Sequence, residues 1–246
     1  MLRFYYVIIK NLKRAWMIPR MDYIADHPEK YSEEFRYRYD KKVIRHMMRT
    51  GRITTTAYGM ENLPEEGGYV MFANHQGKYD ALGIMYSHEK PCSVVMDEKR
   101  SNGILVRQFV DLVDGKRIRL DDLKQAAGII REMTAEVKQG RRFIIFPAGG
   151  YKHRNGNRID AFKPGCFKSA MKAKAPIVPV ALVDSWKVFD LWSLRRVRTQ
   201  VYYLKPILYE EYKHMKSNEI SDLVFRRICK AVWFGEHDLP GEAVEC

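Results

Sequence analysis

Short apolar runs alternate with longer amphipathic stretches from Ile53 onward, and Gly, Pro and polar residues separate them. This rhythm predicts an α/β fold. Candidate strands are Ile53–Tyr58, Tyr69–Ala73, Ser93–Met96, Arg142–Phe146, Ile177–Leu182 and Thr199–Leu204. Candidate helices are Ala81–Ser87, Leu120–Gln139, Cys166–Ala173 and Ser217–Phe234. Because loops that leave the carboxyl ends of strands carry the ligand groups in such folds, the residues just after each strand are the candidates for chemistry.

The first 52 residues differ from this pattern and predict two amphipathic helices. One face of the first helix is marked by apolar residues at alternating spacings of three and four, namely Leu2, Tyr5, Ile9, Leu12 and Trp16. Pro19 is expected to end this helix, and a second, basic helix is expected from Ser32 to Arg49. An apolar aromatic face with basic flanks is typical of a helix that lies in a membrane interface. The alternatives are packing on the domain and a solvated charged face.

The chain of 246 residues therefore divides into an N-terminal helical motif, 1–52, and an α/β domain, 53–246. Its net charge of +13 favours an anionic partner. The excess is local, because residues 1–52 hold thirteen basic and six acidic residues and 152–174 hold seven basic residues and one acidic residue. A content of 46% apolar residues excludes a disordered basic tail. No apolar run reaches the length of about 18 residues that a membrane span needs, and no nucleic-acid reading module is recognisable.

His75 and Asp80 follow the candidate strand Tyr69–Ala73 in the sequence Asn-His-Gln-Gly-Lys-Tyr-Asp. On a regular helix, five residues would separate their directions by about 140°, so they meet only if a turn leads into a helix. In that geometry Asp80 fixes the imidazole tautomer and leaves the other nitrogen as a general base. No Ser or Cys nucleophile stands beside the pair, which favours deprotonation of a substrate hydroxyl. No third ligand close in sequence supports a metal site.

A glycine pair, Gly149-Gly150, follows the candidate strand Arg142–Phe146. Glycines at a strand end let backbone N–H groups approach a phosphate, and nearby basic residues supply charge. These are Lys152, Arg154, Arg158 and Lys163. The alternative is a tight turn beside a solvated basic loop.

Four blocks occur in order: NHxxxxD at 74–80, FPxGG at 146–150, FKxG at 162–165 and IVPVA at 177–181. Together they resemble the glycerolphospholipid acyltransferase superfamily, and specifically bacterial lysophosphatidic acid acyltransferases (1-acyl-sn-glycerol-3-phosphate acyltransferases), over about residues 55–210. The resemblance implies a mixed sheet flanked by helices. It implies that His75 is the catalytic base and Asp80 its orienting carboxylate.

By the same resemblance, Gly149 is the phosphate-site glycine and Pro179 lies in the block linked to the acyl donor. The family's acceptor-binding arginine corresponds to Arg119 or, slightly less well, to Arg117. The substrate phosphate is thus expected among Gly149, Gly150, Lys163, Arg119, Arg117 and Lys152.

Two residues depart from the family pattern. Ala148 stands where the family usually has Glu, and Gly150-Tyr151 stands where it usually has Thr-Arg. Two interpretations follow: an acyltransferase with an altered acceptor site, or a catalytically impaired member that binds lipid.

The resemblance implies transfer of an acyl chain from acyl-CoA or acyl-carrier protein to lysophosphatidic acid, giving phosphatidic acid. Glycerol 3-phosphate or another lysophospholipid is the alternative acceptor. The acyl thioester is a co-substrate, so no resident cofactor or metal is expected. We expect the protein to bind an anionic membrane surface, not nucleic acid, and to lie peripherally on the cytoplasmic face of the cell membrane.

Overall fold

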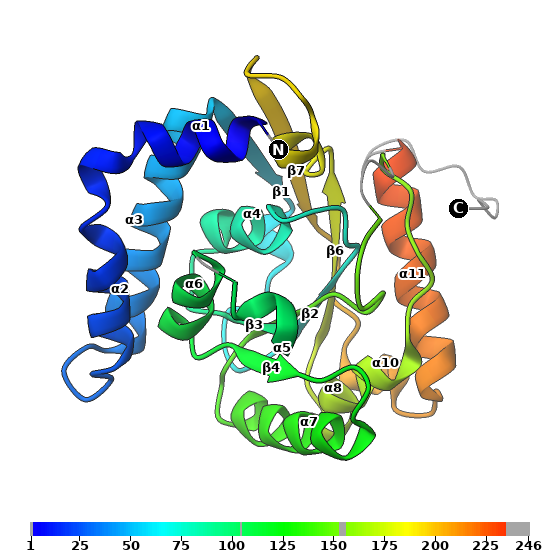
Figure 1. The fold of residues 1–246 in the computed structure, drawn as a ribbon. Coiled ribbons are helices and arrows are strands. Elements are labelled where there is room, and N and C mark those ends of the chain that lie inside the picture. The colour runs from blue at the N-terminus through cyan, green and yellow to red at the C-terminus, as the bar shows by residue number, and fades with distance from the viewer. Residues whose placement is uncertain (1, 104, 153–155, 235–246) are drawn as a thin grey trace.

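A computed structural model of the protein describes residues 2–103, 105–152 and 156–234. Its centre is a seven-stranded sheet in the order β1-β7-β6-β2-β5-β3-β4 (Figure 1). The strands are β1 (Ile53–Tyr58), β2 (Val70–Ala73), β3 (Ser93–Asp97), β4 (Lys116–Ile118), β5 (Phe143–Ile145), β6 (Ile177–Val183) and β7 (Val197–Tyr203). Strands β6, β2, β5, β3 and β4 run parallel, whereas β7 is antiparallel to β6 and β1 is parallel to β7. The predicted mixed α/β sheet is confirmed.

Helices cover both faces of the sheet, which explains why its central strands are apolar throughout. All four residues of β2 are buried. One face packs on α3 (Glu33–Gly51), α4 (Asp80–Ser87) and α6 (Val106–Leu112). The other packs on α7 (Leu123–Lys138), α8 (Lys168–Ala173) and α11 (Ser217–Phe234). The short helices α5 (Glu98–Ser101), α9 (Lys187–Asp190) and α10 (Tyr209–Tyr212) lie in connections.

The six predicted strands are present within a few residues of their expected bounds. The sequence prediction lacked β4 and α6. Strand β4 has only three residues, two of them basic, so it carries no apolar run of the kind that identifies a buried strand.

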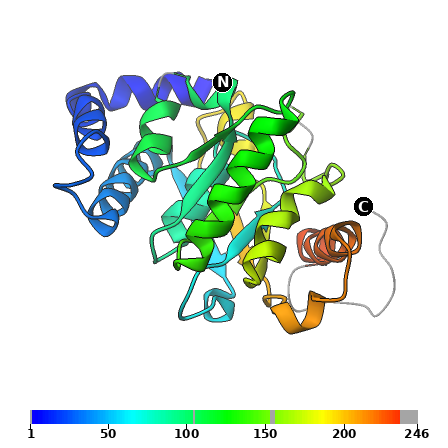
Figure 2. The ribbon, with the colours of Figure 1, turned by 90° about the horizontal axis from the view of Figure 1, so that it is seen from below.

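The N-terminal motif begins with α1 (Leu2–Lys10), a short 3₁₀ turn (Leu12–Arg14) and α2 (Met17–Ala25), followed by α3. It lies at the opposite end of the molecule from α11 (Figures 1 and 2). The expectation that Pro19 ends the first helix is wrong. Pro19 lies in the first turn of α2, where a missing N–H leaves no helical hydrogen bond unmade. The chain bends earlier, between Lys10 and Met17.

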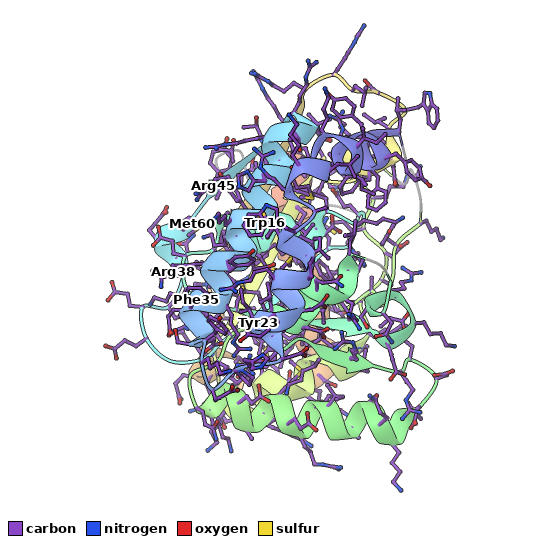
Figure 3. The ribbon with its side chains drawn as sticks, turned by 60° about the vertical axis from the view of Figure 1, so that its left-hand side comes forward. Trp16, Tyr23, Phe35, Arg38, Arg45 and Met60 are labelled. Atoms are coloured by element: carbon purple, nitrogen blue, oxygen red, sulfur yellow. The ribbon has the colours of Figure 1, made fainter. Side chains whose placement is uncertain are left out.

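The apolar face predicted for the first helix is exposed along most of its length. Tyr5, Ile9, Leu12 and Trp16 keep 59–64% of their surface. Figure 3 shows Trp16, just before α2, and Tyr23 of α2 beside α3, which presents Phe35, Arg38 and Arg45. Among the residues described, no helix combines the length and the apolar character that crossing a bilayer requires.

Some of the basic residues of this motif are structural. Arg3 is fully buried and donates to the carbonyl oxygens of Gly51, Ser193 and Arg195, which ties the start of α1 to the end of α3 and to the segment before β7. Arg36 forms a bidentate ion pair with Asp114 at 2.7 Å. Residues of α3 share the sheet's core, and the division of the chain at residue 52 stays a prediction.

Candidate active site

The parallel strands β2, β5, β3 and β6 all end at one edge of the sheet. The loops that leave them therefore gather there, as expected for a ligand site in an α/β fold. Asn74 fixes this edge, because its side-chain amide donates to the carbonyl of Leu182 at 3.0 Å and accepts from the Leu182 N–H at 2.7 Å. The end of β2 is thereby joined to the end of β6.

His75 and Asp80 meet as the sequence predicts. The turn after β2 leads into α4, which begins at Asp80, and His75 Nδ1 lies 2.7 Å from Asp80 Oδ2. The same oxygen accepts from the backbone N–H groups of Gln76 at 2.5 Å and Gly77 at 2.9 Å. Because a carboxylate only accepts, Nδ1 carries the proton and Nε2 is the nitrogen with a free lone pair.

Two residues that the sequence did not single out support Asp80. The hydroxyl of Ser185, just after β6, donates to Asp80 Oδ1. The side-chain oxygen of Gln76 accepts from the backbone N–H of Ser185 at 3.1 Å and lies 3.0 Å from its hydroxyl. Asp80 thus has four donors around it and is 1% exposed. Ser185 lies about a hundred residues from Asp80 in the chain, so only the pairing of β6 with β2 brings it there.

Aromatic rings hold the imidazole from two sides. The ring of Phe146 stacks on His75, with centroids 4.4 Å apart, and the ring of Tyr151 meets it edge-on at 4.6 Å. Burial raises the pKa of Tyr151 to about 12, and the nearby carboxylates of Asp190 and Asp80 add to this, so its hydroxyl stays protonated at neutral pH.

A cationic side chain lies beside each glycine of the turn after β5. Gly149 has a φ of +75°, and a β-carbon added there would lie 2.9 Å from Lys163 Nζ. A β-carbon added to Gly150 would lie 4.0 Å from both terminal nitrogens of Arg100. The structure thus brings Lys163 to the turn, as the sequence predicts, and adds Arg100 from α5, which the sequence did not indicate.

The other predicted phosphate ligands lie farther out. Arg117 pairs with Asp111 of α6 at 2.6 Å. Arg119, at the end of β4, lies 3.6 Å from Glu98 and 3.4 Å from Asp122. Lys152 is exposed, and the predicted Arg154 lies outside the described residues. Arg117 makes no contact with the His75 turn or the glycine turn in the parts of the chain that are described.

Comparisons with known proteins agree with this geometry. The sequence model of the Acyltransferase family matches residues 54–183, from the start of β1 to the end of β6. The chain belongs to the acyltransferase family. The match covers the His75 turn and the glycine turn and more than half of the chain.

Similar proteins carry a more specific name. A putative 1-acyl-sn-glycerol-3-phosphate acyltransferase of Caenorhabditis elegans is 30% identical over 135 residues, covering 54% of this chain and 46% of that protein. A 1-acyl-sn-glycerol-3-phosphate acyltransferase of Borreliella burgdorferi is 28% identical over 138 residues, covering 53% and 52%. The chain thus spans about half the length of these relatives.

The fold is also that of a solved acyltransferase. The crystal structure of the 1-acyl-sn-glycerophosphate acyltransferase PlsC from Thermotoga maritima matches with a TM-score of 0.73 and 16% identity. The match covers 97% of this chain and 95% of that one.

This acyltransferase departs from the family pattern at the glycine turn itself. Ala148, at the position of the family's usual Glu, supplies no carboxylate. It is partly buried and packs against the apolar cluster beneath α7 and α11. Tyr151 occupies the position of the usual arginine, and the Arg100 guanidinium lies 5.6 Å from its ring centroid. A guanidinium is therefore present at the turn, but it comes from α5, the short helix that follows β3. In the described part of the chain, no three His, Cys, Asp or Glu side chains are grouped as metal ligands are.

Proposed function

We propose that this acyltransferase moves an acyl chain from a thioester, acyl-CoA or acyl-carrier protein, to the free hydroxyl of lysophosphatidic acid. The observation that carries the proposal is the 2.7 Å contact between His75 Nδ1 and Asp80 Oδ2 inside the family's matched region. The names of the relatives support the acceptor. Glycerol 3-phosphate or another lysophospholipid is the alternative.

The chemistry follows from the free lone pair on His75 Nε2. It takes the proton of the acceptor hydroxyl while the hydroxyl oxygen attacks the carbonyl carbon of the thioester. Asp80 stabilises the imidazolium that forms, as a buried carboxylate does in hydrolase triads. When the tetrahedral intermediate collapses, the C–S bond breaks and the thiolate takes the proton back from Nε2. The acyl chain never bonds to the protein.

The acceptor phosphate is assigned to the glycine turn. Gly149 and Gly150 present backbone there, with Lys163 on one side and Arg100 on the other. An ammonium and a planar guanidinium that flank a glycine turn suit a phosphate monoester. Arg119 stands at the rim, and Lys152 is exposed beyond Tyr151.

Peripheral binding to the cytoplasmic face of an anionic membrane completes the proposal. The exposed apolar residues of α1 and α2 and the exposed cations of α3 have the character of an interfacial motif. The motif also adjoins the catalytic loop, since Phe4 of α1 packs edge-on against Phe189 at 5.7 Å and lies 5.8 Å below the ammonium of Lys78. A lipid acceptor at this surface would therefore lie close to His75.

The test supplies the purified protein with lysophosphatidic acid and either acyl thioester, and measures turnover as release of the thiol. We expect His75→Ala to lose at least a hundredfold in kcat, because general-base catalysis contributes about 10²–10⁴-fold. His27→Ala, at a partly exposed histidine just after the end of α2, is the matched control and should keep full activity. A His75→Ala protein that is as fast as the parent contradicts the assignment. A panel of acceptors decides among lysophosphatidic acid, glycerol 3-phosphate and other lysophospholipids.

Ala148 supports a second candidate, a catalytically impaired member that binds lipid. It predicts that the parent binds vesicles but shows no turnover. It also predicts that Ala148→Glu, which returns the usual residue, does not bring turnover back.

A further inference from the structure

A row of cations runs along the exposed side of α3. Five exposed basic residues recur at spacings of four and three, which places them on one helix face, and they are Arg38, Lys42, Arg45, Arg49 and Arg52. The row ends at Arg52, where the chain turns from α3 into β1. Arg52 has a φ of +54°, a conformation that normally favours Gly or Asn at the end of a helix.

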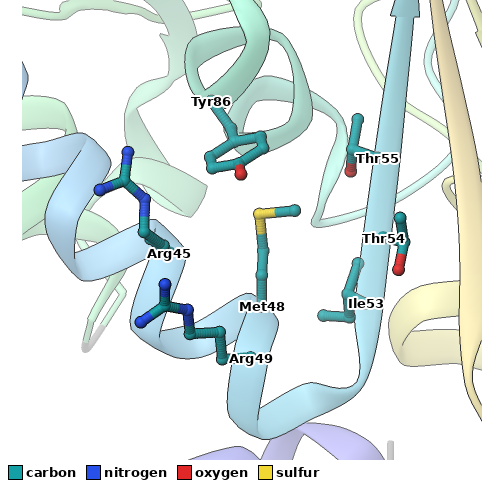
Figure 4. A pocket seen from close by; sticks show the side chains of 7 residues that line it. All are labelled: Arg45, Met48, Arg49, Ile53, Thr54, Thr55 and Tyr86. Carbon is teal, nitrogen blue, oxygen red and sulfur yellow. The ribbon is translucent and has the colours of Figure 1, made fainter.

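At that turn the row meets an arginine from another element and lines a cleft of about 460 Å³. Arg49 and Arg52 come from the end of α3 and Arg196 from the residue before β7, while Thr54 of β1 adds a hydroxyl. The volume lies in the range of about 300–1,000 Å³ that is common for ligand sites. A smaller adjoining hollow of about 190 Å³ shares Arg49 and Thr54 and extends the cleft to Arg45 and Tyr86 (Figure 4).

The positive charge of this cleft is not compensated within the part of the protein that is described. None of the four arginines that line it and its extension lies within 4.0 Å of a described carboxylate. The same excess of positive charge contributes to lowering the pKa of two neighbouring groups. Burial and, next, the charge of Arg52 lower the pKa of Arg3, and burial together with four nearby arginine and lysine charges lowers the pKa of His46. A cationic cleft without its own carboxylates is suited to an anion.

The topology places this cleft on the same sheet edge as His75. Strands β1 and β7 run opposite to β2 and β6, so Ile53 and Val197 lie at the end of the sheet toward which β2 runs. In the strand register, Ala73 at the end of β2 lies level with Tyr203 of β7, so Val197 lies six residues, about 20 Å, farther along that direction. Helix α1 is tied to the end of α3 by the hydrogen bond from Arg3 to the carbonyl of Gly51, next to Arg52, and it exposes Tyr5 and Ile9.

We propose that the cleft formed by Arg49, Arg52, Arg196 and Thr54 binds the phosphomonoester headgroup of an anionic membrane lipid, at a site separate from the catalytic centre. Guanidinium groups bind phosphate oxygens in pairs, and the exposed apolar side chains of α1, the helix tied to Gly51 next to the cleft, suit a lipid, not a soluble phosphate, as the source. A headgroup held there fixes the membrane surface against the edge that carries His75. The inference rests on the proposed membrane association and does not depend on the acyl transfer reaction.

The experiment measures flotation of the full chain with two kinds of phosphatidylcholine vesicle. One kind contains a phosphomonoester lipid, and the other contains a lipid with a carboxylate headgroup at matched surface charge. The cleft variant is Arg49→Gln/Arg52→Gln/Arg196→Gln. The control variant, Lys13→Gln/Arg38→Gln/Lys42→Gln, removes three exposed charges from the same motif away from the cleft. Circular dichroism verifies folding, and the single variant Arg49→Gln replaces the triple variant if the latter does not fold.

We expect the parent and the control variant to prefer phosphate vesicles over carboxylate vesicles, and the cleft variant to lose that preference with at least tenfold weaker binding to phosphate vesicles. Equal losses in both variants on both vesicles would overturn the site. Tight binding of inorganic phosphate without vesicles, abolished in the cleft variant, would assign the cleft to a soluble phosphate instead. A raised KM for acyl-CoA with unchanged vesicle binding would assign it to the donor and also overturn the proposal. Absence of turnover in the parent would refute the proposed reaction alone, since flotation requires none.

Discussion

Ser185 tests whether Asp80 acts on His75 through a fixed geometry. Its hydroxyl is one of four donors to the buried Asp80 carboxylate, and it is itself 3% exposed. A hydrogen bond to a charged group contributes about 1.5–3 kcal/mol. Because three donors remain in Ser185→Ala, we expect the lower part of that range to appear in the barrier, about 1.5–2 kcal/mol. That corresponds to a fall in kcat of about 10–30-fold.

The assay separates a positioning role from a general loss of structure. Ser185 touches Asp80 and Gln76 but no part of the glycine turn among the described contacts, so KM for the acceptor should change by less than about twofold, a change of about 0.4 kcal/mol. Ser185→Thr keeps the hydroxyl and should regain most of the activity. Ser169→Ala is the matched control. Ser169 is also buried, but its hydroxyl donates to the carbonyl oxygen of Cys166, just before α8. A folded Ser185→Ala protein with the kcat of the parent would refute the reasoning.

Three further predictions concern the acceptor site, the core and the membrane surface. Arg100→Gln is expected to raise KM about tenfold for phosphomonoester acceptors and to leave a neutral monoacylglycerol unaffected, measured by steady-state kinetics. Asp40 is fully buried with no described partner for either oxygen, and burial raises its pKa well above the usual value. Above pH 3.8 the unfolded chain loses this proton while the folded protein keeps it, so the free energy of unfolding falls as the pH rises. In Asp40→Asn this contribution to the pH dependence of thermal unfolding should disappear between pH 5 and 8. Trp192 is 72% exposed in the segment that Arg3 holds beside α1, and we expect it to insert into the membrane interface. Trp192→Ser should therefore weaken vesicle flotation severalfold, whereas the control Trp233→Ser, at the end of α11, should not.

What the sequence could predict depends on how far along the chain the partners lie. The contact of His75 with Asp80 was predictable because a short turn and the start of a helix determine it, and this geometric prediction is confirmed. The approach of Lys163 to Gly149 joins two neighbouring blocks of the family pattern. Ser185 and Arg100 were not predictable, since they reach the site only through the pairing of β6 with β2 and of β3 with β5.

The basic residues of the N-terminal motif show the limit of reading charge from a sequence. A helical pattern assigns a side chain to a face, but it does not tell which faces the fold later covers. Arg3 and Arg36 belong to the basic pattern in the sequence, yet the structure buries both and uses them to join the motif to the domain. The exposed cations on α3 are therefore fewer than the sequence suggests.

The position of Arg100 explains how the acceptor site can lack the family's arginine and still hold a guanidinium. Strands β3 and β5 are parallel neighbours, so the residues that follow them leave the sheet side by side. Arg100 follows the end of β3 by three residues, and its guanidinium reaches Gly150 and the ring of Tyr151, which follow β5. An arginine at position 151 would bring a second positive charge close to Arg100, which lies 5.6 Å from the ring centroid of Tyr151, and the two charges would repel each other unless a phosphate lay between them. Tyr151 instead places an aromatic ring against both Arg100 and His75. With tyrosine at 151 in place of the family's usual arginine, the guanidinium at the turn is that of Arg100, which follows β3, and the ring of Tyr151 helps to orient the base.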